Sequence, residues 1–107
     1  MPGIDYDRAR EEITMEEVLT LMGFEPTSRN GDQWYGGCPF HACASRRRRC
    51  FSVNVALGVY NCHECHRKGQ QLQLWAAYID VPLHPATIDL YWTLGRDVPW
   101  LAEFNRS

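Results

Sequence analysis

Apolar residues near the start of the chain recur at helical spacing. Four of them share this spacing: Met15, Val18, Leu19 and Met22. The stripe predicts one buried face of an amphipathic helix. Thr14 and Glu17 stand at capping-box positions ahead of the stripe, and Gly23 suits the end of the helix. The first dozen residues are polar and are expected to be frayed, and turn-forming residues within 25–32 predict a loop.

Alternation of apolar and polar positions predicts short strands in the middle of the chain. Residues 49–55 place phenylalanine and valine on one face and polar side chains on the other, as a half-buried strand does. Residues 57–58 predict a turn, and 59–61 a second strand. A further short strand is expected over 33–37, where two aromatic residues are adjacent.

Helices are expected again in the last third of the chain. Residues 70–80 carry an apolar stripe, and Pro85 fits the first turn of another helix that runs to Leu94 and ends at Gly95. Residues 99–104 could add one short turn. The segment 81–107 holds more large apolar side chains than a short helix can hide. It therefore either wraps the domain or forms an interface, possible partners being another protein or a second copy.

Length and cysteine content limit the class of protein. A chain of 107 residues buries only ~60–65% of its unfolded surface, so a metal or disulfides would help its core. The cysteines number five, and no apolar run resembles a signal peptide or a membrane span. These features favour reduced thiols and a cytoplasmic location, with a secreted disulfide scaffold as the alternative.

Four residues have the spacing of a zinc site, and they form two pairs with two-residue spacers: Cys38 with His41, and Cys62 with Cys65. A tight turn aims both side chains of a pair at one point, and a hairpin between the pairs closes the tetrahedron. With four protein ligands, the single Zn²⁺ is structural and has no open position for water. Cys43 could replace His41 and His66 could compete with Cys65, but the regular spacing favours the first set.

Charge is distributed unevenly along the chain. The net charge is −2 overall, but residues 26–79 hold seven basic side chains against two acids. Residues 1–25 hold seven acids against two arginines, and residues 80–107 hold four acids against two arginines. The metal-binding segment is therefore the basic part of the chain, which is the pattern to look for in a nucleic-acid binder.

Basic and aromatic residues in this segment are candidates for nucleic-acid contacts. The basic ones are Arg46, Arg47, Arg48, Arg49, Arg67 and Lys68, and the aromatic ones are Trp34, Tyr35 and Tyr60. Guanidinium groups match phosphate oxygens, and aromatic rings stack on unpaired bases. The alternatives are a solvated basic loop and aromatic rings that fill the small core. Strand alternation sends Trp34 and Tyr35 to opposite faces, whereas Phe40 and Phe51 are expected in the core.

Three stretches of sequence carry a resemblance to a known family: Trp34-Tyr35-Gly36-Gly37-Cys38-Pro39-Phe40-His41, then Cys50-Phe51-Ser52-Val53, then Val59-Tyr60-Asn61-Cys62 with Cys65. The chain resembles the Cys-His-Cys-Cys zinc-binding domain at the N-terminus of bacterial and phage DNA primases. The resemblance implies a zinc ribbon, in which a small antiparallel sheet carries the metal and helices pack against it. It also implies contact with single-stranded template and cooperation with a separate polymerase domain.

The chain departs from the family pattern at three places. Glu64 and His66 stand where the family usually has glycine, so the turn there must be strained or of another type. The segment between the two ligand pairs is unusually rich in arginine, and the part after Val81 has no counterpart in the family pattern.

These observations predict an α+β fold, a small zinc ribbon flanked by N- and C-terminal helices. An acidic segment with a helix (1–25) is expected to pack on a zinc-ribbon domain (26–80), followed by a helical extension (81–107). The predicted function is a DNA-binding module that acts in trans as an accessory factor to a replication, mobile-element or defence protein. The alternative is a protein-interaction adaptor. No carboxylate cluster, phosphate-binding loop or open metal site indicates an enzyme, although a non-catalytic primase subunit fits.

Overall fold

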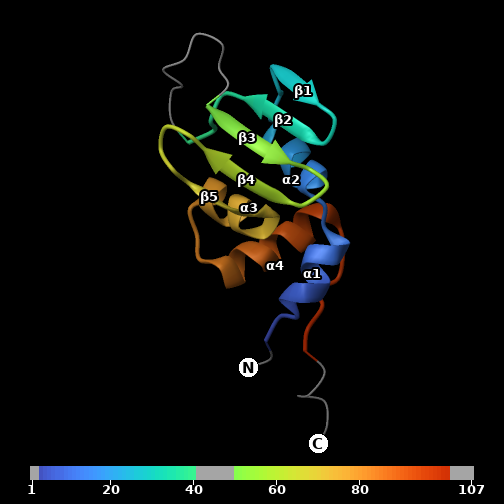
Figure 1. Ribbon diagram of the computed structural model, residues 1–107. Helices are drawn as coiled ribbons and strands as arrows, with labels where there is room; N and C mark the ends of the chain where they lie inside the picture. Colours follow the sequence, from blue (N-terminus) through green and yellow to red (C-terminus); the bar gives the residue numbers. More distant parts are fainter. Residues whose placement is uncertain (1–2, 41–49, 102–107) are drawn as a thin grey trace, which may run out of the picture.

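The computed structural model describes residues 3–40 and 50–101. Its elements in chain order are α1 (Tyr6–Glu12), α2 (Met15–Met22), β1 (Ser28–Asn30), β2 (Gln33–Gly36), β3 (Phe51–Asn54), β4 (Val59–Cys62), β5 (Lys68–Gln70), α3 (Gln71–Ile79) and α4 (Leu83–Leu94). The five strands form one antiparallel sheet in sequence order, and the helices lie behind and below it (Figure 1). The predicted α+β class is confirmed. No helix in the described ranges is long and apolar enough to cross a membrane.

The register of the sheet separates a buried face from an open one. Tyr35 of β2 pairs with Ser52 of β3, which pairs with Asn61 of β4, which pairs with Lys68 of β5. The residues between them point to the opposite face, where Phe51, Val53, Tyr60 and Cys62 are buried. The helices cover only this second face among the described elements (Figure 1).

Apolar stripes of the helices complete the core. Helix α3 contacts α2, α4 and the strands β4 and β5, and its residues Leu72, Leu74 and Trp75 are buried. The predicted helix at the start of the chain is confirmed as α2, with the capping box between Thr14 and Glu17 formed in both directions. The helices at 70–80 and 85–94 are confirmed as α3 and α4.

The prediction of a frayed N-terminus was wrong. Residues 6–12 form α1, because the Asp5 side chain caps it by accepting from the Arg8 amide at 3.2 Å and because Ala9 and Ile13 are fully buried. The sequence did not predict this helix because Ala9 and Ile13 alone mark its buried face. Packing against the rest of the domain therefore stabilises α1 more than its own sequence does.

Two edge strands were also missed. Part of the loop expected at 25–32 is the strand β1, and residues 68–70, expected only to close the metal-binding segment, form β5. Each has three residues and pairs with one strand only, β1 with β2 and β5 with β4. Backbone hydrogen bonding to an existing sheet creates such strands, and polar sequences of three residues carry no alternation that could predict them.

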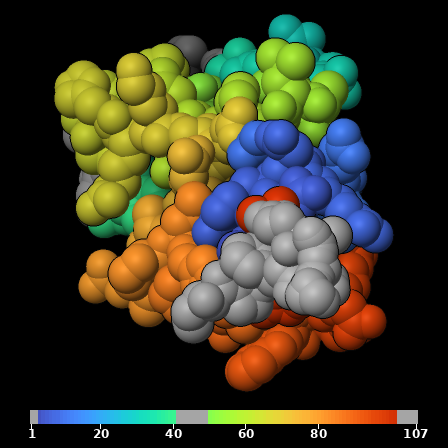
Figure 2. Space-filling model, turned by 90° about the horizontal axis from the view of Figure 1, so that it is seen from below, coloured from blue at the N-terminus to red at the C-terminus, as the bar shows by residue number. Residues whose placement is uncertain are grey.

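The two ends of the described chain lie side by side, away from the sheet (Figures 1 and 2). Ile4 forms an isolated antiparallel bridge with Trp100, and the flanking amides of Asp5 and Leu101 donate to Pro99 and Gly3 carbonyls at 2.8 Å. Residues 99–101, the described part of the short turn expected over 99–104, are not helical, and the rest of that turn lies outside the described residues. The described end of the C-terminal segment therefore lies against the start of the chain.

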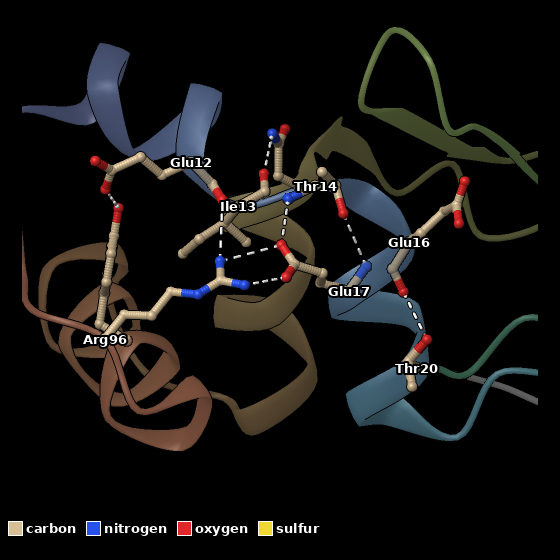
Figure 3. Close-up of polar contacts among 9 residues, drawn as sticks. Glu12, Ile13, Thr14, Glu16, Glu17, Thr20 and Arg96 are labelled. Carbon is tan, nitrogen blue, oxygen red and sulfur yellow. Dashed lines mark hydrogen bonds and ion pairs between the residues drawn. The ribbon is translucent and has the colours of Figure 1, made fainter.

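A polar junction joins both ends to the middle of the fold (Figure 3). The buried Gln71 side chain at the start of α3 donates to the carbonyls of Arg10 and Ile13, at 2.9 Å each. Arg96, just past the end of α4, donates at 3.0 Å to the carbonyl of Glu12, and its side chain pairs with Glu17. These contacts fix the short connection between α1 and α2.

Candidate metal centre

Three cysteine sulfurs converge at one end of the sheet. The Sγ atoms of Cys38, Cys62 and Cys65 all lie within 4.8 Å of one another, and those of Cys38 and Cys65 are 3.8 Å apart. The strand register explains the convergence, because Gly36 at the end of β2 pairs with Phe51, which pairs with Cys62 at the end of β4. Cys38 of the first predicted half-site therefore meets both cysteines of the second.

Backbone amides point at the sulfurs in both half-sites. The Phe40 amide donates to Cys38 Sγ at 3.5 Å, and the Cys65 amide donates to Cys62 Sγ at 3.4 Å. Donors aimed at sulfur favour the thiolate, the form that binds a metal. The turn after Cys62 closes when the His66 amide donates to the Cys62 carbonyl at 3.0 Å.

The backbone conformation at His66 confirms one consequence of the departure from the family pattern. His66 has a φ of 64°, in the left-handed region that glycine adopts most easily. Glu64, the other residue in place of a glycine, has no positive φ. The strain of the second knuckle is thus confined to the position that follows Cys65.

The sulfur cluster has the dimensions of a zinc site. Tetrahedral zinc with Zn–S distances of ~2.3 Å holds neighbouring sulfurs ~3.8 Å apart, which is the Cys38–Cys65 separation. Without a cation, burial, with a smaller effect of the neighbouring Cys62 and Cys65 sulfurs, raises the pKa of the Cys38 thiol to about 12. A bound divalent cation stabilises all three thiolates and so lowers the pKa values that burial raises. The cluster is therefore positioned to bind one zinc ion.

The fourth ligand lies beyond the described part of the chain. Residues 41–49, which include His41 and its rival Cys43, are outside the described residues, so His41 remains a prediction. The other rival, His66, does not join the sulfur cluster, whereas Cys65 does. Cys50 is buried outside the cluster, and no disulfide links the four cysteines that the structure describes.

The candidate nucleic-acid residues fall in different places. Tyr35 and Lys68 share the open face of the sheet, and Arg67 lies beside the first knuckle with its guanidinium carbon 4.7 Å from the Phe40 ring centroid. Trp34 is on the helix-covered face, partly buried. The structure places Tyr60 in the core at 5% exposure. The four arginines at 46–49 lie outside the described residues.

Three further residues lie near the candidate site: two aromatic residues predicted for the core and one arginine that the sequence did not indicate. Phe51 is fully buried, and Phe40 is partly buried against the same core, where Tyr60 lies between them with ring centroids at 5.7 and 6.5 Å. Arg29 was not among the candidates, yet its guanidinium carbon lies 4.3 Å from the Trp34 ring centroid. Its pairing with Trp34 depends on β1, the strand that the sequence did not predict.

Comparisons with known proteins agree with this geometry. The family described as CHC2 zinc finger matches residues 5–105. Among solved structures, the zinc-binding and RNA polymerase domains of the Aquifex aeolicus primase superpose with a TM-score of 0.72 at 20% sequence identity. The alignment covers 98% of this chain but 24% of the primase chain, and at this identity it shows the fold alone. No curated protein matches the chain.

Proposed function

The chain belongs to the CHC2 zinc-finger family, the primase-type zinc ribbons, and we propose that it is a non-catalytic module that holds single-stranded DNA. It acts in trans, in the cytoplasm, as an accessory factor to a polymerase or another nucleic-acid enzyme of replication, a mobile element or defence. The protein partner supplies the chemistry, and this chain supplies the grip on the strand.

The register of the open sheet face carries the proposal. Tyr35 and Lys68 stand in one row across four strands, separated by Ser52 and Asn61. Adjacent strands lie ~4.8 Å apart, so the backbone positions that carry the aromatic ring and the ammonium group are ~14 Å apart on one surface. A strand that crosses this row could stack a base on Tyr35 and place a phosphate at Lys68.

The residues around that row suit a polyanion. The second row of the open face contains amides and one valine: Asn30, Gln33, Asn54, Val59 and Gln70. No described residue of either row carries a carboxylate. Arg67 extends the positive charge beyond the sheet, next to the first knuckle, whereas Arg29 lies with Trp34 on the opposite face. The arginines at 46–49 belong to the same chain segment, and their proposed role is phosphate contact without sequence information.

Zinc has a structural role in this proposal. Cys38, Cys62, Cys65 and His41 would hold the ion, which supplies a rigid tetrahedral link between the ends of β2 and β4. The link sets the position of the chain that leads into the arginines, and it holds Arg67 next to the first knuckle. Removal of the ion should therefore weaken DNA binding by disordering the grip.

Fluorescence anisotropy tests the proposal. Labelled single-stranded DNA should bind the zinc-loaded chain more tightly than duplex DNA. The slope of log K against log salt should be about −3 if four arginines each contact a phosphate, at ~0.7 per contact. Changing residues 46–49 to serine should remove this contribution and leave the smaller slope of the remaining basic residues. Lys68→Gln should weaken binding further than Arg8→Gln, a matched loss of charge on α1, and equal effects of the two would contradict the open-face assignment.

One observation favours a second function, a protein-interaction adaptor. An apolar stripe lies on the outer side of α4 and the turn before it. It consists of Val81, Pro85, Ile88 and Trp92. Trp92 is 74% exposed and Val81 38% exposed. This surface could receive another protein or a second copy. Concentration-dependent association in sedimentation that Trp92→Ser abolishes, in a chain that binds no DNA, would favour the adaptor.

A further inference from the structure

A cavity of about 520 Å³ opens beside the first metal-binding knuckle. It lies between the loop that follows α2, the turn at residues 37–39 and the outer end of α3. Its lining includes Phe24, Glu25, Thr27, Cys38 and Tyr78. Cavities of ~300–1,000 Å³ are the usual size of small-molecule sites. The residues proposed to bind DNA on the open sheet face do not line this cavity.

The lining combines a carboxylate with an aromatic ring. Glu25 is exposed and carries the one carboxylate among the described lining residues, and no ion pair within the described part of the chain involves it. Tyr78 is 42% exposed, and its hydroxyl donates to the Met22 carbonyl at 3.4 Å. Its ring also lies 5.9 Å from that of Trp75, so two contacts hold the ring in place.

The charge of Glu25 decides what the cavity accepts from a nucleic acid. A carboxylate repels phosphate, so a strand near the knuckle must present a base edge to it. An exocyclic amino group donates to a carboxylate, as the cytosine amino group does to acidic side chains in DNA recognition. Thymine offers only a ring N–H flanked by two carbonyl oxygens, which face the carboxylate unfavourably. A single carboxylate is a poor set of ligands for a metal cation.

We propose that this cavity takes one unpaired base that carries an amino group, with cytosine as its simplest case. The base donates its amino hydrogen to Glu25 and lies against the Tyr78 ring. This inference deepens the proposed function and rests on it, because the cavity would select a base of the strand that the basic residues hold. Pro39 lines the cavity and Arg46 follows seven residues later, so one short segment links base selection to phosphate contact.

Nucleosides test the cavity without the phosphates. We would titrate the zinc-loaded, ¹⁵N-labelled chain with deoxycytidine and with thymidine and follow the amide signals of residues 22–27 and 37–38. Deoxycytidine should shift them with a dissociation constant roughly 5–20-fold lower than that of thymidine, the lower part of the range for one specific base contact. Glu25→Gln should remove the difference. Glu16→Gln, an equal loss of charge on the exposed side of α2, should preserve it.

The outcomes separate this inference from the proposed function. Equal responses to both nucleosides, or a preference that survives Glu25→Gln, would overturn the cavity assignment. Either result would leave single-strand binding through the basic residues intact. If deoxycytidine binds selectively while single-stranded oligonucleotides do not bind, the cavity assignment stands and the proposed function fails.

Discussion

Arg96 and Glu17 form an ion pair across 79 positions of the chain, with Arg96 Nη1 3.2 Å from Glu17 Oε1 (Figure 3). The same guanidinium donates to the Glu12 carbonyl, and the Glu12 carboxylate accepts from the buried Tyr91 hydroxyl at 2.8 Å. Two carboxylates of the acidic N-terminal segment thus face groups from the C-terminal part of the chain. These two acidic residues therefore join the N-terminal helices to the C-terminal part of the chain.

The Arg96–Glu17 pair should make stability depend on pH in a definite direction. Because Arg96 donates to its carboxylate, the pKa of Glu17 lies below its ordinary value of 4.5. A lowered folded-state pKa means that the stabilisation is present above pH 4.5 and is lost as the pH falls through the folded-state value. Arg96→Gln should therefore lower the unfolding temperature at pH 7, and its difference from the wild type should shrink below pH 4.5.

Thermal unfolding from pH 7 to pH 4 under saturating zinc measures this difference. Competition of protons for the zinc ligands acts on both proteins, so only the difference between them is interpreted. Lys68→Gln removes an exposed cation that forms no ion pair within the described part of the chain, and serves as the control for charge alone. A constant gap between Arg96→Gln and the wild type across this pH range would contradict the assignment.

Gln71 should be among the most sensitive polar residues of the fold. Its side chain is 6% exposed and satisfies two carbonyls at the junction of α1 and α2. Gln71→Leu leaves those carbonyls without a buried donor, at a cost of about 1–3 kcal/mol. Urea unfolding of the zinc-loaded chain measures the loss. Gln73→Leu, on the same helix at an exposed position, is the comparison, although it also removes a cap of the Gln70 amide.

Cobalt substitution should identify the ligand set of the metal centre. Three sulfurs and one imidazole predict a tetrahedral cobalt spectrum with three thiolate ligands. Cys43→Ser should leave that spectrum unchanged, whereas His41→Ala should weaken binding. The opposite pattern would show that Cys43 supplies the fourth ligand.

Removal of the metal should unfold the sheet. Structural zinc contributes on the order of 10 kcal/mol to small domains, more than a chain of this size can lose. Chelation is therefore expected to disorder residues 34–68, with loss of circular dichroism and of dispersed amide signals. Rebinding of zinc should release protons, since the thiols of the unfolded segment, with an ordinary pKa of ~8.5, are mostly protonated at neutral pH. A spectrum unaffected by chelation would rule out a folding role for zinc.

His66 offers a test that separates strain from ligation. Its φ of 64° costs a residue with a side chain about 1 kcal/mol that glycine avoids. His66→Gly should therefore raise the free energy of unfolding of the zinc-loaded chain by up to about 1 kcal/mol, and it should not lower zinc affinity. If zinc affinity fell instead, the imidazole would have to be counted among the ligands.

Helices α2, α3 and α4 and the sulfur cluster of the metal centre were the predictable parts of this molecule. Helix α2 carries its own caps and stripe, and the spacing of Cys38, Cys62 and Cys65 is set by local turns. Both are therefore encoded in a few neighbouring residues. The edge strands β1 and β5 and the helix α1 depend on contacts with distant segments. Their sequences say little alone, which is why Arg29 escaped notice beside Trp34.

Assignment of the aromatic residues required the register. Adjacent residues on a strand were correctly expected on opposite faces, but alternation alone does not say which face the helices cover. The sheet pairing shows that Tyr35 is on the open face and that Tyr60 is in the core. Sequence spacing could not find the cavity beside Cys38 either, because its walls come from α3 and two separate loops.

The bridge between Ile4 and Trp100 has a mechanical consequence. The two described ends of the chain lie side by side in antiparallel orientation. Opposing forces on them would therefore break the two hydrogen bonds that flank this bridge one after the other. Tension applied through a tether at either end would therefore peel the terminal segments apart before it reached the sheet. The domain could also be spliced into a loop of a larger protein with both seams on one side, leaving the metal centre and the open face turned outward.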